Sequence, residues 1–256
     1  MAEPKIIVCA DHNDLNIKAA EYCAKTAKQA MFSSGTCTIS LSGGSTPKSL
    51  YALLATPEWR SRFNWKHIHL FWGDERCVPI DHPDSNFGMV KRELLSKVEI
   101  PEENIHRFPV ELQDPAAIAQ AYDASIRQFF GVAHTKSEVP RFDLVFLGLG
   151  ENGHTVSLFP HSPVLQEKEK LAVADYIEEM KSYRVTTTVP LINAARHALF
   201  LVSGTSKAQV VQEVIEGPRQ PEQLPAQLIS PVRGTLVWLL DRDAAALTQF
   251  ARGSNA

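Results

Sequence analysis

Cysteine is scarce in this chain of 256 residues, and the four that occur stand far apart. They form no C-x-x-C pair, which argues against a zinc site and is typical of reduced cytosolic thiols. No apolar run approaches the roughly 20 residues needed to span a bilayer. Residues 1–8 are too short and wrongly flanked for a signal peptide. We therefore expect a cytoplasmic protein that does not bind a membrane.

The chain also lacks an excess of charge of one sign. It carries 26 Lys and Arg against 29 Asp and Glu, a net charge of -3, without a long run of either sign. Bulk attraction to nucleic acid or anionic lipid is therefore not expected. The 44% of hydrophobic residues is ample for a core. We expect a single domain over residues 1–256.

Strand-like and helix-like segments alternate along the sequence, which favours a mostly parallel sheet with helices on both faces. Asp14 can cap the first long helix, and a polar loop is expected over Gly73–Ser85. The expected strands cover residues 6–9, 36–41, 67–72, 142–147, 171–176, 184–189, 198–203 and 235–240. The expected helices cover residues 14–32, 47–54, 86–96, 114–130 and 207–215, with a last one from 243.

The first loop with chemical character is Ser42-Gly43-Gly44-Ser45-Thr46-Pro47, which joins a strand to a helix. Its two glycines allow a sharp turn and expose backbone N–H groups. Thr46 can cap the helix, and Pro47 suits its first position. Free amides at a helix N-terminus form an anion site, most often for phosphate. The alternative is an ordinary strand–helix turn.

A second loop, Trp72-Gly73-Asp74-Glu75-Arg76, follows another apolar strand. Arg76 can clamp a phosphate with two hydrogen bonds. Asp74 or Glu75 can orient that arginine or take part in proton transfer. The alternative is a surface ion pair in a polar loop.

The third loop, residues 148–160, follows the buried-strand pattern of residues 142–147 and has three glycines within six residues before His154. Ligands of open α/β sheets bind at the carboxyl ends of the strands. His154 is therefore a candidate general acid or base. Ser157 lacks the strand–elbow context of a nucleophile, which favours a cap or a core hydroxyl.

A fourth loop, residues 202–208, again joins a strand to a helix and carries Lys207. Positive charge in a first helical turn is unfavourable, so a functional reason is expected, such as a second cation for a phosphate. The segment from Gly204 to Ala208 is one residue away from the G-x-S-x-G nucleophile elbow. An elbow enzyme needs its histidine after the serine, whereas every histidine of this chain precedes Ser206.

Together the four loops predict a site for a small phosphorylated molecule that undergoes proton transfer. No Rossmann or Walker glycine motif occurs in a suitable context, so no nucleotide is expected. His67 and His69 have no carboxylate or cysteine placed with them for metal binding. We expect neither a metal nor another cofactor.

With these loops in order, the chain closely resembles the 6-phosphogluconolactonase family. The matching segments are residues 41–47, 72–79, 84–87, 148–160, 184–190 and 204–207. The family shares its fold group with glucosamine-6-phosphate deaminase and ribose-5-phosphate isomerase. The resemblance implies a three-layer α/β/α sandwich with a mostly parallel, Rossmann-like sheet. It also implies hydrolysis of 6-phospho-D-glucono-1,5-lactone in the oxidative pentose phosphate pathway, by a monomer or homodimer.

On this resemblance, His154 is expected to be the general base that activates water. The phosphate of the sugar substrate would be held by Gly43, Gly44, Ser45, Thr46, Arg76 and Lys207. Further substrate or supporting contacts are expected from Asp74, Asn86, Asn152, Gly153 and Arg184. One position departs from the family pattern, because Asn152 stands where the family usually has aspartate and can offer His154 a hydrogen bond but no charge.

Three alternatives remain open on the sequence. A sugar-phosphate deaminase or isomerase of the same fold would use a carboxylate where Asp74 stands, although Arg76 argues for the lactonase. A non-catalytic sugar-phosphate sensor would carry a DNA-binding domain, for which no room is expected before the first strand at Ile6. A serine hydrolase based on Ser206 is the third.

Overall fold

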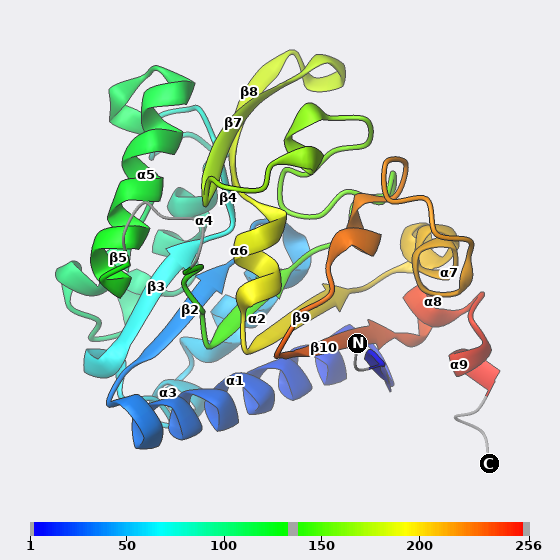
Figure 1. The fold of residues 1–256 in the computed structure, drawn as a ribbon. Helices are drawn as coiled ribbons and strands as arrows, with labels where there is room; N and C mark the ends of the chain where they lie inside the picture. Colours follow the sequence, from blue (N-terminus) through cyan, green and yellow to red (C-terminus); the bar gives the residue numbers. More distant parts are fainter. Residues whose placement is uncertain (1–2, 133–137, 253–256) are drawn as a thin grey trace.

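A parallel sheet of seven strands forms the centre of the computed structural model, which describes residues 3–132 and 138–252 (Figure 1). Every strand pair in this sheet is parallel. In spatial order the strands are β1 (Lys5–Cys9), β10 (Thr235–Asp241), β9 (His197–Val202), β6 (Leu144–Leu147), β2 (Cys37–Leu41), β3 (Ile68–Trp72) and β5 (Ile105–His106).

Helices cover both faces of this sheet. On one face α1 (His12–Ser34) runs along β1, β10 and β2, and α2 (Ser45–Leu54) packs against α1. On the other face lie α5 (Pro115–Phe130) and α6 (Val189–Ala194) (Figure 1). The expected three-layer α/β/α fold is confirmed. The remaining helices are α3 (Pro57–Arg60), α4 (Asn86–Glu93), α7 (Ala208–Glu216), α8 (Arg242–Ala245) and α9 (Gln249–Arg252).

A second, antiparallel sheet projects above the first (Figure 1), and the strands predicted over residues 171–176 and 184–189 belong to it rather than to the parallel sheet. It consists of β4 (Asp74–Arg76), β8 (Ser182–Thr187) and β7 (Ala172–Ile177) in that order. The prediction of a loop over Gly73–Ser85 was therefore wrong for residues 74–76, which form a strand. The strand β4 has only three residues, all charged, so hydrophobic alternation could not reveal it.

Two predicted helix starts also need correction. The cap of α1 is Asp11, whose carboxylate accepts the N–H of Asp14 at 2.8 Å. The helix α2 begins at Ser45, so Thr46 lies inside its first turn and does not cap it. Both corrections are shifts of a few residues, the usual error of boundaries read from sequence.

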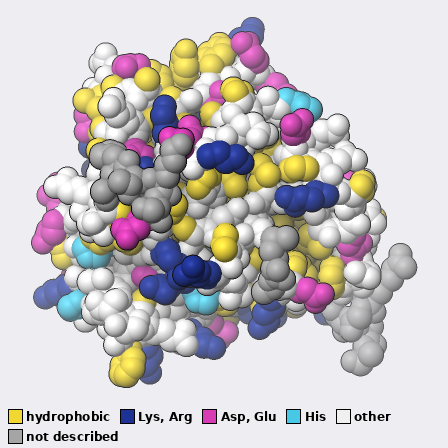
Figure 2. Space-filling model, viewed as in Figure 1, with side chains coloured by type: hydrophobic (Ala, Val, Ile, Leu, Met, Phe, Trp, Pro, Cys, Tyr) yellow, Lys and Arg dark blue, Asp and Glu magenta, His cyan; other side chains and the backbone are white. Residues whose placement is uncertain are grey.

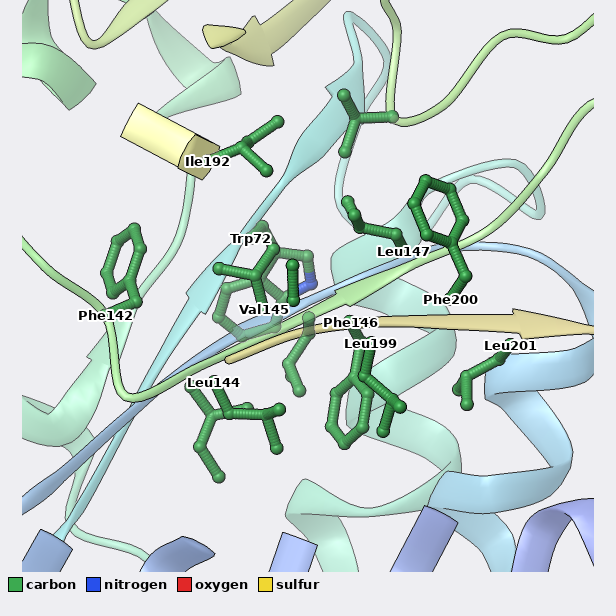
Figure 3. Close-up of a cluster of buried hydrophobic side chains, with 14 of the residues drawn as sticks. Trp72, Phe142, Leu144, Val145, Phe146, Leu147, Ile192, Leu199, Phe200 and Leu201 are labelled. Atoms are coloured by element: carbon green, nitrogen blue, oxygen red, sulfur yellow. The ribbon is translucent and has the colours of Figure 1, made fainter. Parts of the chain in front are cut away.

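The strand β6 is the most enclosed part of the core. All four of its residues are at most 1% exposed, so both of its faces are buried, as expected for the centre of a parallel sheet. Its side chains pack in one apolar cluster with those of β9 and with Trp72, Phe142 and Ile192 (Figure 3). Within the described residues, no helix combines the length and apolar character needed to cross a membrane.

The position of β6 also creates a switch point in the sheet. The chain crosses from β2 to β3 and β5 on one side, and from β6 to β9 and β10 on the other. The connections after β2 and β6 therefore leave in opposite directions and open a crevice at the carboxyl ends of these strands. Open α/β sheets bind their ligands in such a crevice.

Two buried tyrosines hold the strand ends beside this crevice. The Tyr51 hydroxyl accepts the N–H of Ser42 at 3.0 Å and donates to the Ser42 carbonyl at 2.9 Å. The Tyr122 hydroxyl does the same for Trp72, at 2.8 and 3.0 Å. Each hydroxyl satisfies two buried backbone groups that would otherwise lack a partner where the strand ends.

We expect Tyr51→Phe to lower the free energy of unfolding by about 1–3 kcal/mol, because both backbone groups of Ser42 lose their partner. Urea denaturation measures this loss. Tyr183→Phe is the matched control, since Tyr183 is 48% exposed. An equal stability of the two variants would contradict the role given to the Tyr51 hydroxyl.

Candidate active site

The loop after β2 presents unpaired amides at the crevice. Gly44 has φ 98° and ψ 169°, a conformation that side chains other than glycine rarely adopt, and α2 starts at the next residue. The amides of Gly43 and Gly44 donate to no acceptor within the described part of the chain. Free N–H groups at the positive end of a helix form a site for an anion.

The loop after β9 repeats this backbone conformation but is held differently. Gly204 has φ 100° and ψ 152°, and its N–H lies 3.1 Å from both carboxylate oxygens of Asp241. Asp241 also accepts the Ser203 hydroxyl and the N–H of Ala244. The Gly204 N–H is therefore already hydrogen-bonded to a carboxylate of the protein. The loop after β2, whose amides have no such partner, is the better site for an added anion.

Asn86 closes over the first loop. A Cβ atom at Gly43 would stand 2.0 Å from the Asn86 side-chain oxygen, so only glycine fits there. The Asn86 side-chain amide donates to the Asp74 carbonyl at 3.0 Å. Two separate predicted site residues are therefore packed against each other.

Glu75 fixes the segment that carries Asn86. Its buried carboxylate accepts the N–H groups of Arg76, Asn86 and Phe87 at 2.7–2.8 Å, and the Ser85 hydroxyl at 3.2 Å. Burial raises the pKa of Glu75, and these backbone hydrogen bonds act in the opposite direction. The structure thus assigns Glu75 to loop positioning.

Asp74 is likewise committed to internal contacts. It is 7% exposed, and its carboxylate accepts the Ser157 hydroxyl at 2.7 Å and the Asn86 side-chain amide at 3.2 Å. Burial raises the pKa of Asp74, while Arg76, Ser157 and Arg184 lower it. Ser157 is a core hydroxyl, one of the two roles that the sequence favoured.

Two arginines face each other across the antiparallel sheet. Arg76 of β4 is paired in register with Arg184 of β8. Arg76 donates to the Asp84 carbonyl, and Arg184 donates to the Ser182 hydroxyl at 3.0 Å. Like charges directly opposite each other destabilise a sheet. Such a pair is expected where an anion is bound between the two.

His154 lies between these elements, on the loop after β6. Its Nδ1 is 2.6 Å from the side-chain oxygen of Asn152, and its ring stacks on Phe159 with centroids 4.2 Å apart. An amide oxygen only accepts hydrogen bonds, so Nδ1 carries the proton and Nε2 keeps a free lone pair. The Gly150 position has no room for a Cβ atom, which would stand 2.0 Å from Nδ1.

The electrostatic surroundings strongly favour the neutral imidazole. Burial and, to a smaller extent and in this order, the charges of Lys207, Arg184 and Arg76 together lower the pKa of His154 from 6.5 to about 4. Arg76 of β4, Arg184 of β8 and Lys207, which follows β9, therefore all act electrostatically on this one histidine. No nearby carboxylate is among the causes of this shift.

Lys207 reaches the site from the end of the turn Thr205–Lys207, just before α7, rather than from inside the helix as expected. Its ammonium lies 3.9 Å from the carboxylate of Glu151, whose side chain is 66% exposed. An exposed ion pair of this length contributes little to stability. Lys207 is therefore available to a stronger anion.

The predicted site residues of the four loops lie around the crevice, but Gly153 has a packing role. Gly153 is buried against Leu224: a Cβ atom there would stand 2.7 Å from the Leu224 side chain, and its φ of 79° also requires glycine. This glycine packs the loop against the protein. Phe159 was not predicted as a site residue, because its stacking on His154 depends on how the loop turns back and leaves no signal in the sequence.

The described residues hold no group of three or more His, Cys, Asp or Glu side chains that could bind a metal ion. The chemistry available to this site therefore rests on one neutral imidazole, three cations and free backbone amides. Such a set can bind a phosphorylated molecule and accept a proton from it or from water.

We expect NMR titration to give His154 a pKa near 4, and Asn152→Asp to raise it, because a carboxylate beside Nδ1 stabilises imidazolium. In the wild type the unfolded chain binds the proton first, so His154 makes stability fall as pH drops from 6.5 to about 4. That loss should shrink in Asn152→Asp. Asn152→Ala, which adds no charge, is the control, and an unchanged pKa in Asn152→Asp would contradict this account.

Known proteins are similar to this chain in sequence and in fold. The chain is 44% identical over 229 residues to a 6-phosphogluconolactonase of Synechocystis sp., covering 89% of this chain and 92% of that protein. A solved 6-phosphogluconolactonase from Trypanosoma cruzi superposes with a TM-score of 0.85 at 30% identity, over 96% of this chain and 97% of the other. A monomeric glucosamine-6-phosphate deaminase superposes with a TM-score of 0.80 at 21% identity, over 95% and 99% of the two chains, which shows the fold alone.

The sequence profile of glucosamine-6-phosphate isomerases/6-phosphogluconolactonase matches residues 10–238. This match includes all four loops of the candidate site. The protein therefore belongs to the glucosamine-6-phosphate isomerase/6-phosphogluconolactonase family.

Proposed function

We propose that this protein is a lactonase that hydrolyses 6-phospho-D-glucono-1,5-lactone to 6-phospho-D-gluconate in the oxidative pentose phosphate pathway. The observation that carries the proposal is the neutral His154, held by Asn152 among three cations. Relatives that bear the name 6-phosphogluconolactonase support the reaction. A δ-lactone is an activated ester, so a positioned water molecule and a base suffice for its hydrolysis.

The phosphate of the substrate is held at the end of the crevice away from the reacting carbonyl. The amides of Gly43, Gly44 and Ser45 face it from the start of α2, with Thr46 beside them. Arg76 and Lys207 supply the cations, and Arg184 stands opposite Arg76. Binding energy from this remote group fixes the lactone carbonyl near His154, which is catalysis by orientation.

His154 acts first as a base and then as an acid. Its Nε2 takes a proton from water while the water oxygen attacks C1 of the lactone, which forms a tetrahedral intermediate. Amides of the glycine-rich loops stabilise the oxyanion. The bond between C1 and the ring oxygen then breaks, and the imidazolium gives its proton to that oxygen. The products are the open-chain acid and the neutral enzyme.

Substrate binding also tunes the base. A pKa of about 4 keeps His154 deprotonated at neutral pH but makes it a weak base. Two of the causes of that low pKa are cations that the phosphate neutralises, Arg76 and Lys207. The bound phosphate therefore raises the pKa of His154 toward the working pH, where general-base catalysis is most effective.

We expect His154→Ala to lower kcat for freshly generated 6-phosphogluconolactone by about 10²–10⁴-fold, the usual contribution of a general base, while 6-phosphogluconate still binds. The assay subtracts spontaneous hydrolysis of the lactone. Near-normal turnover would exclude His154 as the base. Ammonia release from glucosamine 6-phosphate by the wild type would instead favour a deaminase.

We expect Arg76→Ala to raise KM for the lactone about 10- to 100-fold with a smaller effect on kcat, because a charge-assisted hydrogen bond to phosphate is lost. Arg92→Ala is the matched control, since it removes an exposed arginine from the end of α4. If Arg76→Ala and Arg92→Ala had the same KM, Arg76 would be a structural residue that holds Asp84.

A further inference from the structure

A row of arginines lies at the edge of the sheet opposite the candidate active site. Arg141, Arg196 and Arg233 stand just before β6, β9 and β10, which are neighbours in the parallel sheet. Their side chains therefore meet at the amino ends of these strands. Figure 2 shows Lys and Arg side chains gathered in this region. None of the three arginines belongs to the predicted catalytic machinery.

The guanidinium group of Arg141 is held rigidly but not by a carboxylate. Its Nε donates to the Ala194 carbonyl at 2.9 Å, and one terminal nitrogen donates to the Arg233 carbonyl at 2.9 Å. The nearby charges of Arg196 and Arg233 add to the effect of burial in lowering the pKa of Arg141. The three cations are thus close enough to repel one another.

The acidic side chains near these arginines neutralise only part of their positive charge. Asp143 lies 3.2 Å from Arg196, but its other oxygen accepts both the N–H and the hydroxyl of Thr38. The Glu167 carboxylate accepts three backbone N–H groups of its own loop. Glu138 is exposed. Among the described residues, several arginine nitrogens therefore have no hydrogen-bond acceptor and can bind an added anion.

The arginines line one wall of a cleft of about 1100 Å³. Apolar side chains, including Phe129, Phe130 and Pro190, line another part of it. This volume is slightly above the range typical of small-molecule sites, about 300–1000 Å³. The combination of an apolar wall and three arginines, one of them fixed by two hydrogen bonds, suits a ligand with one apolar and one anionic end.

We propose that this cleft is a second ligand site, which binds a small molecule with a phosphate or diphosphate at one end and a planar or apolar group at the other. Guanidinium groups bind phosphate oxygens with paired hydrogen bonds, and a dianion relieves the repulsion among the arginines. The site lies at the amino edge of the sheet, so its ligand does not compete with the substrate at the carboxyl edge.

The test uses ADP as a probe of this chemistry, with adenosine and pyrophosphate as its two halves. Amide NMR signals are followed in the full-length protein. We expect ADP to shift signals of residues 141–144, 193–197 and 232–236, and adenosine not to. The double variant Arg196→Gln/Arg233→Gln should weaken this binding about tenfold or more, because charge-assisted hydrogen bonds are lost. Arg92→Gln, the charge-matched control, should not.

Lactonase activity of the double variant should equal that of the wild type, since neither arginine lies at the catalytic edge. If the double variant unfolds, Arg233→Gln alone provides the same comparison, because the exposed Arg233 side chain makes no hydrogen bond within the described part of the chain. Three results would overturn the proposal: ADP shifts confined to residues 43–46 and 148–154, equal binding by adenosine and ADP, or binding of an acidic peptide without binding of ADP or pyrophosphate.

Discussion

The burial of β6 between β2 and β9 is the constraint on which the rest of the structure depends. Because its four residues are enclosed on both faces, the strand has one register and one direction in the sheet. Its neighbours run parallel to it, so three strands deliver their following loops to the same edge. The imidazole of His154, the free amides after β2 and the ammonium of Lys207 meet there for this reason alone.

The second constraint is electrostatic. Three cations act on a histidine that has no acidic partner among the described residues, and two of them oppose each other in register across a sheet. Such an arrangement is costly in the free protein and becomes favourable when an anion binds. Asp74 offsets part of this charge, because it interacts electrostatically with Arg76 and Arg184, whereas the Glu75 carboxylate is hydrogen-bonded to the loop that it positions. The proposed lactonase mechanism uses this unbalanced charge twice, for binding and for tuning the base.

Much of the fold and site could be predicted from the sequence, because those parts depend on local patterns. Apolar runs identified six of the seven strands of the parallel sheet, and glycines with a following polar residue identified the loops at their ends. The edge strand β5 was not predicted, because two residues are too few to show a pattern. The strand β4 was not predicted, because its three charged residues show no alternation of apolar and polar side chains. The roles of Glu75 and Phe159 were not predicted either, because each role depends on which residues the folded loop brings into contact with that side chain.

The sequence by itself determined the order of strands and helices, the glycine-rich loops and the residue types available for chemistry, since these follow from short-range patterns. Only the tertiary structure decided that Arg76 opposes Arg184, that Asn86 covers Gly43, and that arginines before three strands form a row. These contacts join residues far apart in the chain. They arise from sheet order and loop packing, which depend on the burial of the whole core rather than on any one segment.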